Sequence, residues 1–178
     1  MLVSPSATSY YLGMAVRISR PLLDAIHAQA SAAAPHECCG LLLGREIPAE
    51  STVANFARVS EIRPAINVAA DPLHRFEVDP ALLIATYREA RAGGLDIIGH
   101  YHSHPAGEAV PSAVDAEMAR AEGEIWLLAG GDGTLRAWRA RRGGTLHGRF
   151  EPVELMTGSP QPLLARAVPE RHEDAGIA

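Results

Sequence analysis

The chain has 178 residues, a length that suits one domain with a sizeable core, since domains typically take ~100–200 residues. Hydrophobic residues make up 47% and charged residues 21%, which is ordinary for a globular domain. The net charge is −5 and the basic residues, all arginine, are scattered, so the composition excludes a concentrated basic surface for nucleic acid or an anionic membrane.

The chain is predicted to form one domain over residues 15–156, between a flexible leader at 1–14 and a disordered tail at 157–178. The leader has no clear periodicity, and the tail is rich in proline and mixed charge. Short apolar or alternating runs indicate strands, while proline and glycine bound the helices. Helices are expected over 20–34, 80–92 and 112–121. Strands are expected over 15–19, 39–44, 51–59, 95–101, 124–129, 134–140 and 146–153, with a loop at 61–72.

The order of these elements predicts a mixed α/β or α+β domain. Glycine-rich segments at 130–133 and 142–144 separate the last three expected strands, and such segments are typical of hairpin turns. Because hairpins join antiparallel strands, a wholly parallel sheet is excluded.

The only two cysteines, Cys38 and Cys39, are neighbours. Adjacent cysteines rarely bond to each other and no second pair is present, so a reducing compartment is expected. The N-terminus lacks a charged region followed by a long apolar one, and no run reaches the ~18 apolar residues of a membrane span. The sequence therefore predicts a cytoplasmic protein without a membrane partner.

Three histidines, His100, His102 and His104, alternate at the end of an expected strand. On an extended segment all three point to one face. Side chains two positions apart lie ~6.6 Å apart along a strand, and those four positions apart lie ~13 Å apart. An adjacent pair can therefore bind one ion, while the third histidine lies nearby as support.

A catalytic zinc site requires a third protein ligand and one open position for water. Asp115 is the candidate, since it lies in the first turn of the helix expected after the histidine loop. The same segment, Ser112-Ala-Val-Asp115, also matches a helix capping box, in which the serine caps and the acid reaches back. Spacing alone leaves both roles of Asp115 open.

His102-Ser-His-Pro, followed by Pro111-Ser112-Ala-Val-Asp115, resembles the signature of JAMM (MPN-plus) metallopeptidases. That family also has a glutamate well upstream, beside an apolar strand bounded by glycine, and Glu37-Cys-Cys-Gly-Leu-Leu-Leu-Gly44 fits this element. The resemblance covers about residues 15–155. It implies a JAMM/MPN-like fold, with a mixed, mostly antiparallel sheet flanked by helices in a three-layer arrangement like that of cytidine deaminases.

Carried onto matching positions, the resemblance implies that His102, His104 and Asp115 ligate Zn²⁺. It further implies that Glu37 is the general base and that Ser112 donates a hydrogen bond to the developing oxyanion. The activity so implied is zinc-dependent hydrolysis of a peptide or isopeptide bond, after the C-terminal Gly-Gly of a ubiquitin-like or sulfur-carrier protein. Mixed His/Asp ligation would also suit iron or manganese.

His100 departs from the family pattern, in which an aromatic or aliphatic residue is expected; it either supports a metal ligand or packs at the strand end. Two rival functions remain, namely a non-catalytic MPN scaffold that has lost the metal and a metal-dependent hydrolase acting on a small amide. Two other kinds of zinc enzyme are excluded because the metal ligands that they need are missing. Gly40 stands where His36-Glu37 would need a second histidine for His-Glu-x-x-His, and the Pro-Cys-x-x-Cys of nucleoside deaminases is absent.

Overall fold

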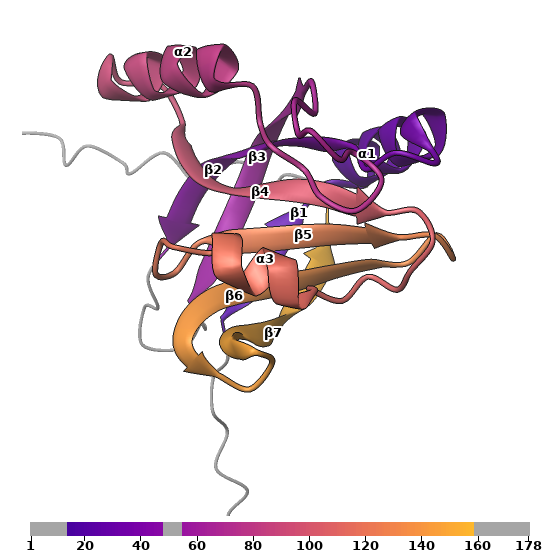
Figure 1. The fold of residues 1–178 in the computed structure, drawn as a ribbon. Coiled ribbons are helices and arrows are strands. Elements are labelled where there is room, and N and C mark those ends of the chain that lie inside the picture. Colours follow the sequence, from indigo (N-terminus) through magenta and orange to yellow (C-terminus); the bar gives the residue numbers. More distant parts are fainter. Residues whose placement is uncertain (1–13, 48–54, 159–178) are drawn as a thin grey trace, which may run out of the picture.

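A computed structural model describes residues 14–47 and 55–158 (Figure 1). In chain order the elements are β1 (Ala15–Ile18), α1 (Arg20–Ala33), β2 (Cys39–Ile47), β3 (Phe56–Ala65), α2 (Pro80–Arg91), β4 (Asp96–His104), α3 (Ala113–Met118), β5 (Ile125–Gly130), β6 (Leu135–Gly144) and β7 (Gly148–Thr157). The predicted elements are found with shifted bounds, except that residues 51–54 of the strand expected over 51–59 lie outside the described residues. The loop expected from residue 61 is wrong over 61–65, which belong to β3, and α3 ends three residues early.

In the described part of the chain the seven strands close into a barrel in the order β1-β3-β2-β4-β5-β6-β7. Four neighbouring pairs are antiparallel, and β1–β3, β1–β7 and β4–β5 are parallel. The mixed, mostly antiparallel sheet is therefore confirmed. The cytidine-deaminase-like three-layer arrangement is not confirmed. That arrangement needs an open sheet with helices on both faces, whereas here β1 bonds to both β3 and β7 and closes the sheet.

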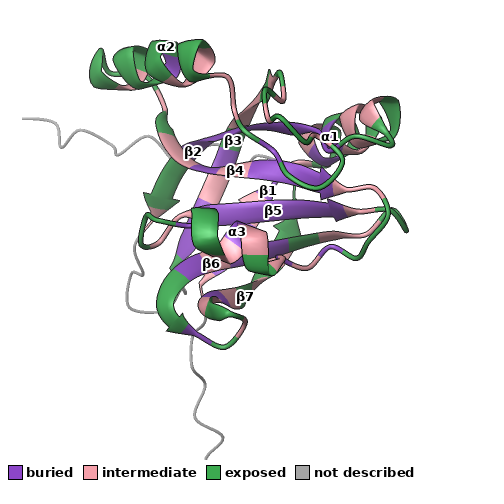
Figure 2. Ribbon diagram, viewed as in Figure 1, coloured by how far each residue is buried: buried purple, intermediate pink, exposed green. Residues whose placement is uncertain are grey.

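The core lies along β4 and β5, at the middle of the sheet (Figure 2). One apolar cluster lies inside the barrel, where α1 contributes Leu23 and Ile26. A second cluster lies outside it, around Phe76, Trp126 and Phe150, and α3 lies beside this cluster. Among the helices described, none has the length and apolar character that a membrane span requires.

The expected leader and tail lie almost wholly outside the described residues. Met14, the last residue of the expected leader, is partly buried against the inner cluster. At the other end β7 continues to Thr157, the first residue of the expected tail. The proposed boundaries at residues 15 and 156 stay predictions.

Gly99 allows β4 and β5 to approach closely at the centre of the barrel. A Cβ added there would lie 1.9 Å from the carbonyl oxygen of Ile125 on β5. We expect Gly99→Ala to lower the free energy of unfolding by about 3 kcal/mol, the upper end of the range for overpacking. Urea unfolding measures this change. Gly107→Ala is the control, because its Cβ would meet His104 Cβ at an ordinary 3.6 Å; equal losses in the two variants would contradict the close approach.

Candidate metal centre

The pairing of β2 with β4 places Glu37 beside the histidine pair. Cys39 lies opposite His102 in this antiparallel ladder, and the Ser103 N–H donates to the Cys38 carbonyl at 3.1 Å. Two places further along, the same register puts Glu37 opposite His104. Glu37 Oε1 accordingly lies 3.9 Å from His104 Nε2.

The two histidines predicted as ligands turn their Nε2 atoms toward each other, 3.1 Å apart. His102 is fully buried, and its ring stacks on Phe76 with 4.3 Å between centroids. His104 Nδ1 lies 3.2 Å from the carbonyl oxygen of Glu108. A hydrogen on that Nδ1 leaves the lone pair on Nε2, which is the tautomer that a metal ligand needs.

Asp115 reaches the same point from α3. Its Oδ1 lies 3.3 Å from His102 Nε2, and its Oδ2 lies 3.3 Å from His104 Nε2. The capping box is present as well, since Ser112 Oγ accepts from the Asp115 N–H while Oδ2 accepts from the Ser112 N–H at 2.6 Å. The helix cap is thus present, and it leaves the same carboxylate within 3.3 Å of both imidazoles, where the predicted ligand role needs it.

The ionisation of these groups follows from burial and from one another. Burial lowers the pKa of His102 to about 4, so the ring is neutral at pH 7. Burial opposes a charge on Asp115, but hydrogen bonds from His102 and His104 hold the pKa of Asp115 well below its usual range. Burial also opposes a charge on His104, yet the Asp115 carboxylate raises the pKa of His104 overall. The centre therefore holds a carboxylate anion beside a neutral imidazole.

Glu37 differs from Asp115 in its environment. Its side chain is 7% exposed, and Oε2 has no hydrogen-bond partner among the described residues. Burial raises the pKa of Glu37 to about 7, and the attraction of His104 only partly opposes this. A carboxylate whose pKa lies near neutrality can both accept and return a proton, as a general base requires.

These donors fit a divalent metal such as zinc. Ligand atoms of Glu37, His102 and His104 all lie within 4.8 Å of one another, and Asp115 adds an oxygen 3.3 Å from each of the two imidazole nitrogens. Two imidazoles, which bind an ion through an unprotonated Nε2, and one carboxylate form a donor set that zinc accepts. Asp115 fits the third position better than Glu37, because it lies nearer to the histidines and is ionised.

Several side chains around the centre escaped the sequence analysis. Phe76 packs against His102, and Asn67 Nδ2 donates to the Glu37 carbonyl oxygen at 2.9 Å. Both come from the segment between β3 and α2, which carries no local motif. A stack of Phe76 on a histidine gives no signal in one sequence, so neither residue could have been found from spacing.

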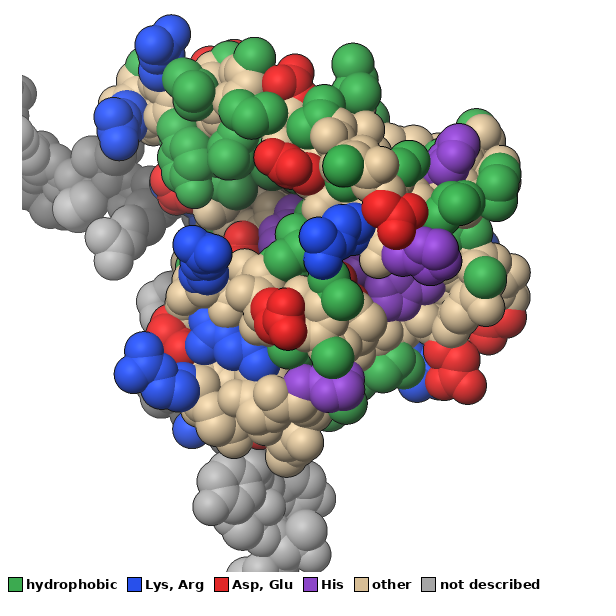
Figure 3. All heavy atoms as spheres, viewed as in Figure 1, with side chains coloured by type: hydrophobic (Ala, Val, Ile, Leu, Met, Phe, Trp, Pro, Cys, Tyr) green, Lys and Arg blue, Asp and Glu red, His purple; other side chains and the backbone are tan. Residues whose placement is uncertain are grey.

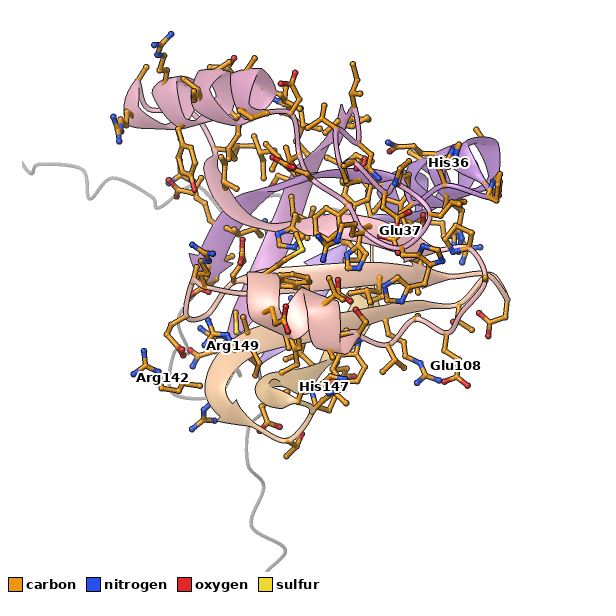
Figure 4. The ribbon with its side chains drawn as sticks, in the orientation of Figure 1. His36, Glu37, Glu108, Arg142, His147 and Arg149 are labelled. Carbon is orange, nitrogen blue, oxygen red and sulfur yellow. The ribbon has the colours of Figure 1, made fainter. Side chains whose placement is uncertain are left out.

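His100 faces away from the Nε2 pair. Its Nδ1 lies 3.2 Å from Glu124 Oε1, and its ring packs against Trp126 with 4.0 Å between centroids. Packing at the strand end, one of the two readings left open for His100, is wrong in its place, since His100 lies in the middle of β4; the contacts themselves are those of a packed side chain. Figure 3 shows several histidine side chains on the face that carries α3, and Figure 4 shows Glu37 by the C-terminal end of β4.

Comparison with known proteins gives a family match over most of the domain. The model for prokaryotic homologues of the JAB domain matches residues 19–141, which include all five predicted site residues. A protein from Desulfitobacterium hafniense has a solved structure that aligns with a TM-score of 0.67 at 23% identity, covering 80% of this chain and 92% of that one. At that identity the likeness speaks for the fold alone.

Two curated relatives are similar in sequence. A desampylase of Haloferax volcanii is 33% identical over 130 residues, which are 73% of this chain and 88% of the relative. A protein of Thermus thermophilus described as a "Probable TtuB-protein conjugate cleaving protease" is 33% identical over 110 residues, 62% of this chain and 67% of the relative.

The donor set leads to a first expectation about metal content. We expect the purified protein to carry about one zinc per chain and His104→Ala to lose most of it. Loss of a group that only hydrogen-bonds to a metal ligand already costs about 10–100-fold in metal affinity, and loss of the ligand itself should cost at least as much. Elemental analysis after dialysis measures this. His27→Ala, on α1 and remote from the centre, should retain the metal. Full zinc occupancy in His104→Ala would remove this histidine from the ligand set.

The raised pKa of Glu37 leads to a second expectation, about the metal-free protein. Since the folded state holds this proton up to about pH 7 while the usual carboxyl releases it near 4.5, stability is lost as pH rises through that window. Glu37→Gln escapes this loss. We expect the variant to be about 1–3 kcal/mol more stable at pH 8 and no more stable at pH 4.5. Urea unfolding in EDTA at both values measures it; a pH-independent difference would mean that burial does not perturb Glu37.

Proposed function

Because the chain belongs to the family of prokaryotic homologues of the JAB domain, we propose that it is a zinc metallopeptidase that cleaves a peptide or isopeptide bond. The family match confirms the resemblance seen in the sequence. The observation that carries the proposal is the convergence of four side chains on one buried point. They come from β4, α3 and the residues just before β2, and they are His102, His104, Asp115 and Glu37.

His102, His104 and Asp115 would hold the ion, and Glu37 would stand beside it. Bound zinc supplies a Lewis acid that polarises the scissile carbonyl and lowers the pKa of water to about 7. The Phe76 ring over His102 and the Glu108 carbonyl at His104 Nδ1 fix the two imidazole planes. These contacts keep the ligand set in place before substrate arrives.

Glu37 would act as the general base. Its buried carboxylate takes a proton from the attacking water and returns it to the departing amine, and a pKa near 7 suits both transfers. The backbone around it is held from two sides, since the Glu37 N–H donates to the Pro72 carbonyl at 2.7 Å and its own carbonyl accepts from Asn67. A fixed backbone limits how far the carboxylate can move between the two steps.

Ser112 would donate a hydrogen bond to the oxyanion. In the free protein its hydroxyl donates to Asp115 Oδ2 at 2.8 Å while its oxygen accepts from the Asp115 N–H. Rotation about the C–O bond redirects the hydrogen to substrate and leaves the oxygen as the helix cap. Such a donor, which gains strength only as charge develops, can be worth about 3 kcal/mol.

The names of the relatives support a substrate class. One is named a desampylase, and the other is described as cleaving conjugates between TtuB and proteins. Together with the family resemblance, they support a ubiquitin-like or sulfur-carrier protein as the partner, cut after its C-terminal Gly-Gly. The free, buried thiols of Cys38 and Cys39 agree with a reducing compartment, and we place the activity in the cytoplasm.

The two rival functions have less support. A non-catalytic MPN scaffold would have lost its ligands, whereas this chain keeps the two histidines, the aspartate and the glutamate, with 3.3–3.9 Å between their facing atoms. A hydrolase of small amides remains the other candidate for the same centre, but none of the relatives described above bears a name of that kind.

Cleavage of a defined carrier tests the proposal. We expect the zinc-loaded protein to cut a ubiquitin-like carrier that extends past Gly-Gly, releasing the extension in a form that mass spectrometry detects. Glu37→Ala should keep the zinc and lose about 10²–10⁴-fold in rate, because a general base is not a ligand.

Two outcomes would contradict parts of the proposal. A folded, metallated protein that cuts no carrier would reject the substrate class while leaving the metal centre standing. Zinc loss in Glu37→Ala would instead make Glu37 a ligand and remove it as the base.

A further inference from the structure

The metal ligand contributed by α3 rests on a weak element. His102 and His104 belong to β4, which bonds to neighbours on both sides, whereas Asp115 lies in a helix of only six residues. Isolated helices shorter than about 12 residues are marginal in water, because nucleation fixes many dihedrals for few hydrogen bonds. The position of Asp115 therefore depends on what holds the two ends of α3.

The N-terminal end of α3 is held by Asp115 itself. The capping box uses Oδ2, the oxygen that also lies 3.3 Å from His104 Nε2. An oxygen shared between the Ser112 N–H and the centre cannot fix the helix independently of the centre. A restraint that does not involve the Asp115 carboxylate acts at the other end, in addition to the Asp115 N–H that donates to Ser112 Oγ.

At the C-terminal end, Arg149 of β7 bonds the segment that follows the helix (Figure 4). Its Nε donates to the carbonyl of Ala119 in a short hydrogen bond, its Nη2 to the carbonyl of Ala121 at 3.1 Å and its Nη1 to Glu122 Oε1 at 2.6 Å. The Arg149 side chain is only 13% exposed. A cation at this end also complements the partial negative charge of the last carbonyls.

This contact leads directly to Asp115. Ala119, whose carbonyl accepts from Arg149, donates its N–H to the carbonyl of Asp115 at 2.9 Å. Glu122 is anchored in turn, because its carboxylate accepts from the Arg142 N–H at 3.0 and 3.1 Å. A chain of hydrogen bonds thus connects β6 and β7 with the backbone of the third ligand.

We propose that Arg149 is a positioning residue of the metal centre, which sets Asp115 by clamping the C-terminal end of α3 to β7. The inference rests on the proposed role of Asp115 as a ligand and extends it to a residue 34 positions later in the chain. The hydrogen bonds that Arg149 makes to described residues go to Ala119, Ala121 and Glu122 and to neither histidine, so its effect passes through α3.

The test compares two arginine variants. Arg149→Met keeps the aliphatic stem and removes the donors. Arg139→Met is the control, because Arg139 lies on the neighbouring strand and bonds the same loop at Gly123, at 3.2 Å, and a distant carboxylate at Glu46, without reaching α3. Zinc affinity is measured by competition with a chelator, and unfolding of the metal-free protein by urea.

We expect Arg149→Met to weaken zinc binding about tenfold or more, as outer partners of metal ligands do, and to alter the visible spectrum of the cobalt-loaded protein. Arg139→Met should leave both unchanged, whatever it costs in stability. Arg149→Lys, which can reach one carbonyl, should restore part of the affinity. In an Asp115→Ala background the Arg149 change should cost no further affinity, since its effect passes through that side chain.

Each contrary result has a distinct meaning. If Arg149→Met loses stability but keeps the zinc affinity and cobalt spectrum of the parent, Arg149 is structural only and the inference fails. If Arg149→Met fails to fold, an unchanged affinity in Arg149→Lys decides against the inference in the same way, and a loss decides for it. If the parent protein binds no zinc, the proposed function fails first.

Discussion

The antiparallel pairing of β2 with β4 is the constraint on which the rest of the centre depends. It joins segments 65 residues apart through the Cys38 N–H and Ser103 Oγ, and it fixes Glu37 opposite the histidine pair. A slip of one residue would turn every side chain of β4 to the opposite face, which would direct both imidazoles into the barrel. The other edge of β4 opposes such a slip, because it is bonded to β5. At Gly99 the two strands approach so closely that no residue with a Cβ could take that place.

At this centre the roles proposed for Asp115 and Glu37 follow from the different environments of their carboxylates. Asp115 is buried but receives hydrogen bonds from two imidazoles and from Ser112, so its anion is favoured. Glu37 is buried with one oxygen unpartnered among the described residues, so its anion is disfavoured. A fixed anion suits a ligand, and a carboxylate balanced between two protonation states suits a base. The proposed assignment of one carboxylate as ligand and the other as base thus follows from their hydrogen bonds more than from residue type.

The sequence predicts the individual helices and strands better than it predicts that the sheet closes into a barrel. Helix and strand order could be read from alternation, prolines and glycine pairs. Spacing suggested a pair of histidines and Asp115, whereas Glu37 and Ser112 came only from the resemblance to JAMM metallopeptidases. Residues 61–65 were expected to be a loop because charges and Pro64 interrupt the pattern, yet pairing with β2 and ion pairs from Arg63 to Glu61 and Glu89 hold them in β3. Barrel closure joins β1 to β7 across most of the chain, and no local pattern encodes such a pairing. The same holds for Phe76, which meets His102 only in the folded protein.

The strand that closes the barrel also bonds the segment after α3, the helix that carries the proposed third ligand. β7 bonds to β1 along one edge and presents Arg149 to the end of α3. Loosening of β7 should therefore displace Asp115 before it displaces the histidines, because β5 and β6 lie between β7 and the strand β4 that carries them. The converse follows by linkage, because any ion that binds the closed arrangement more tightly than the loosened one must stabilise closure by the same free energy. The metal centre and the last strand of the barrel are in this sense one cooperative unit, although β7 supplies no ligand.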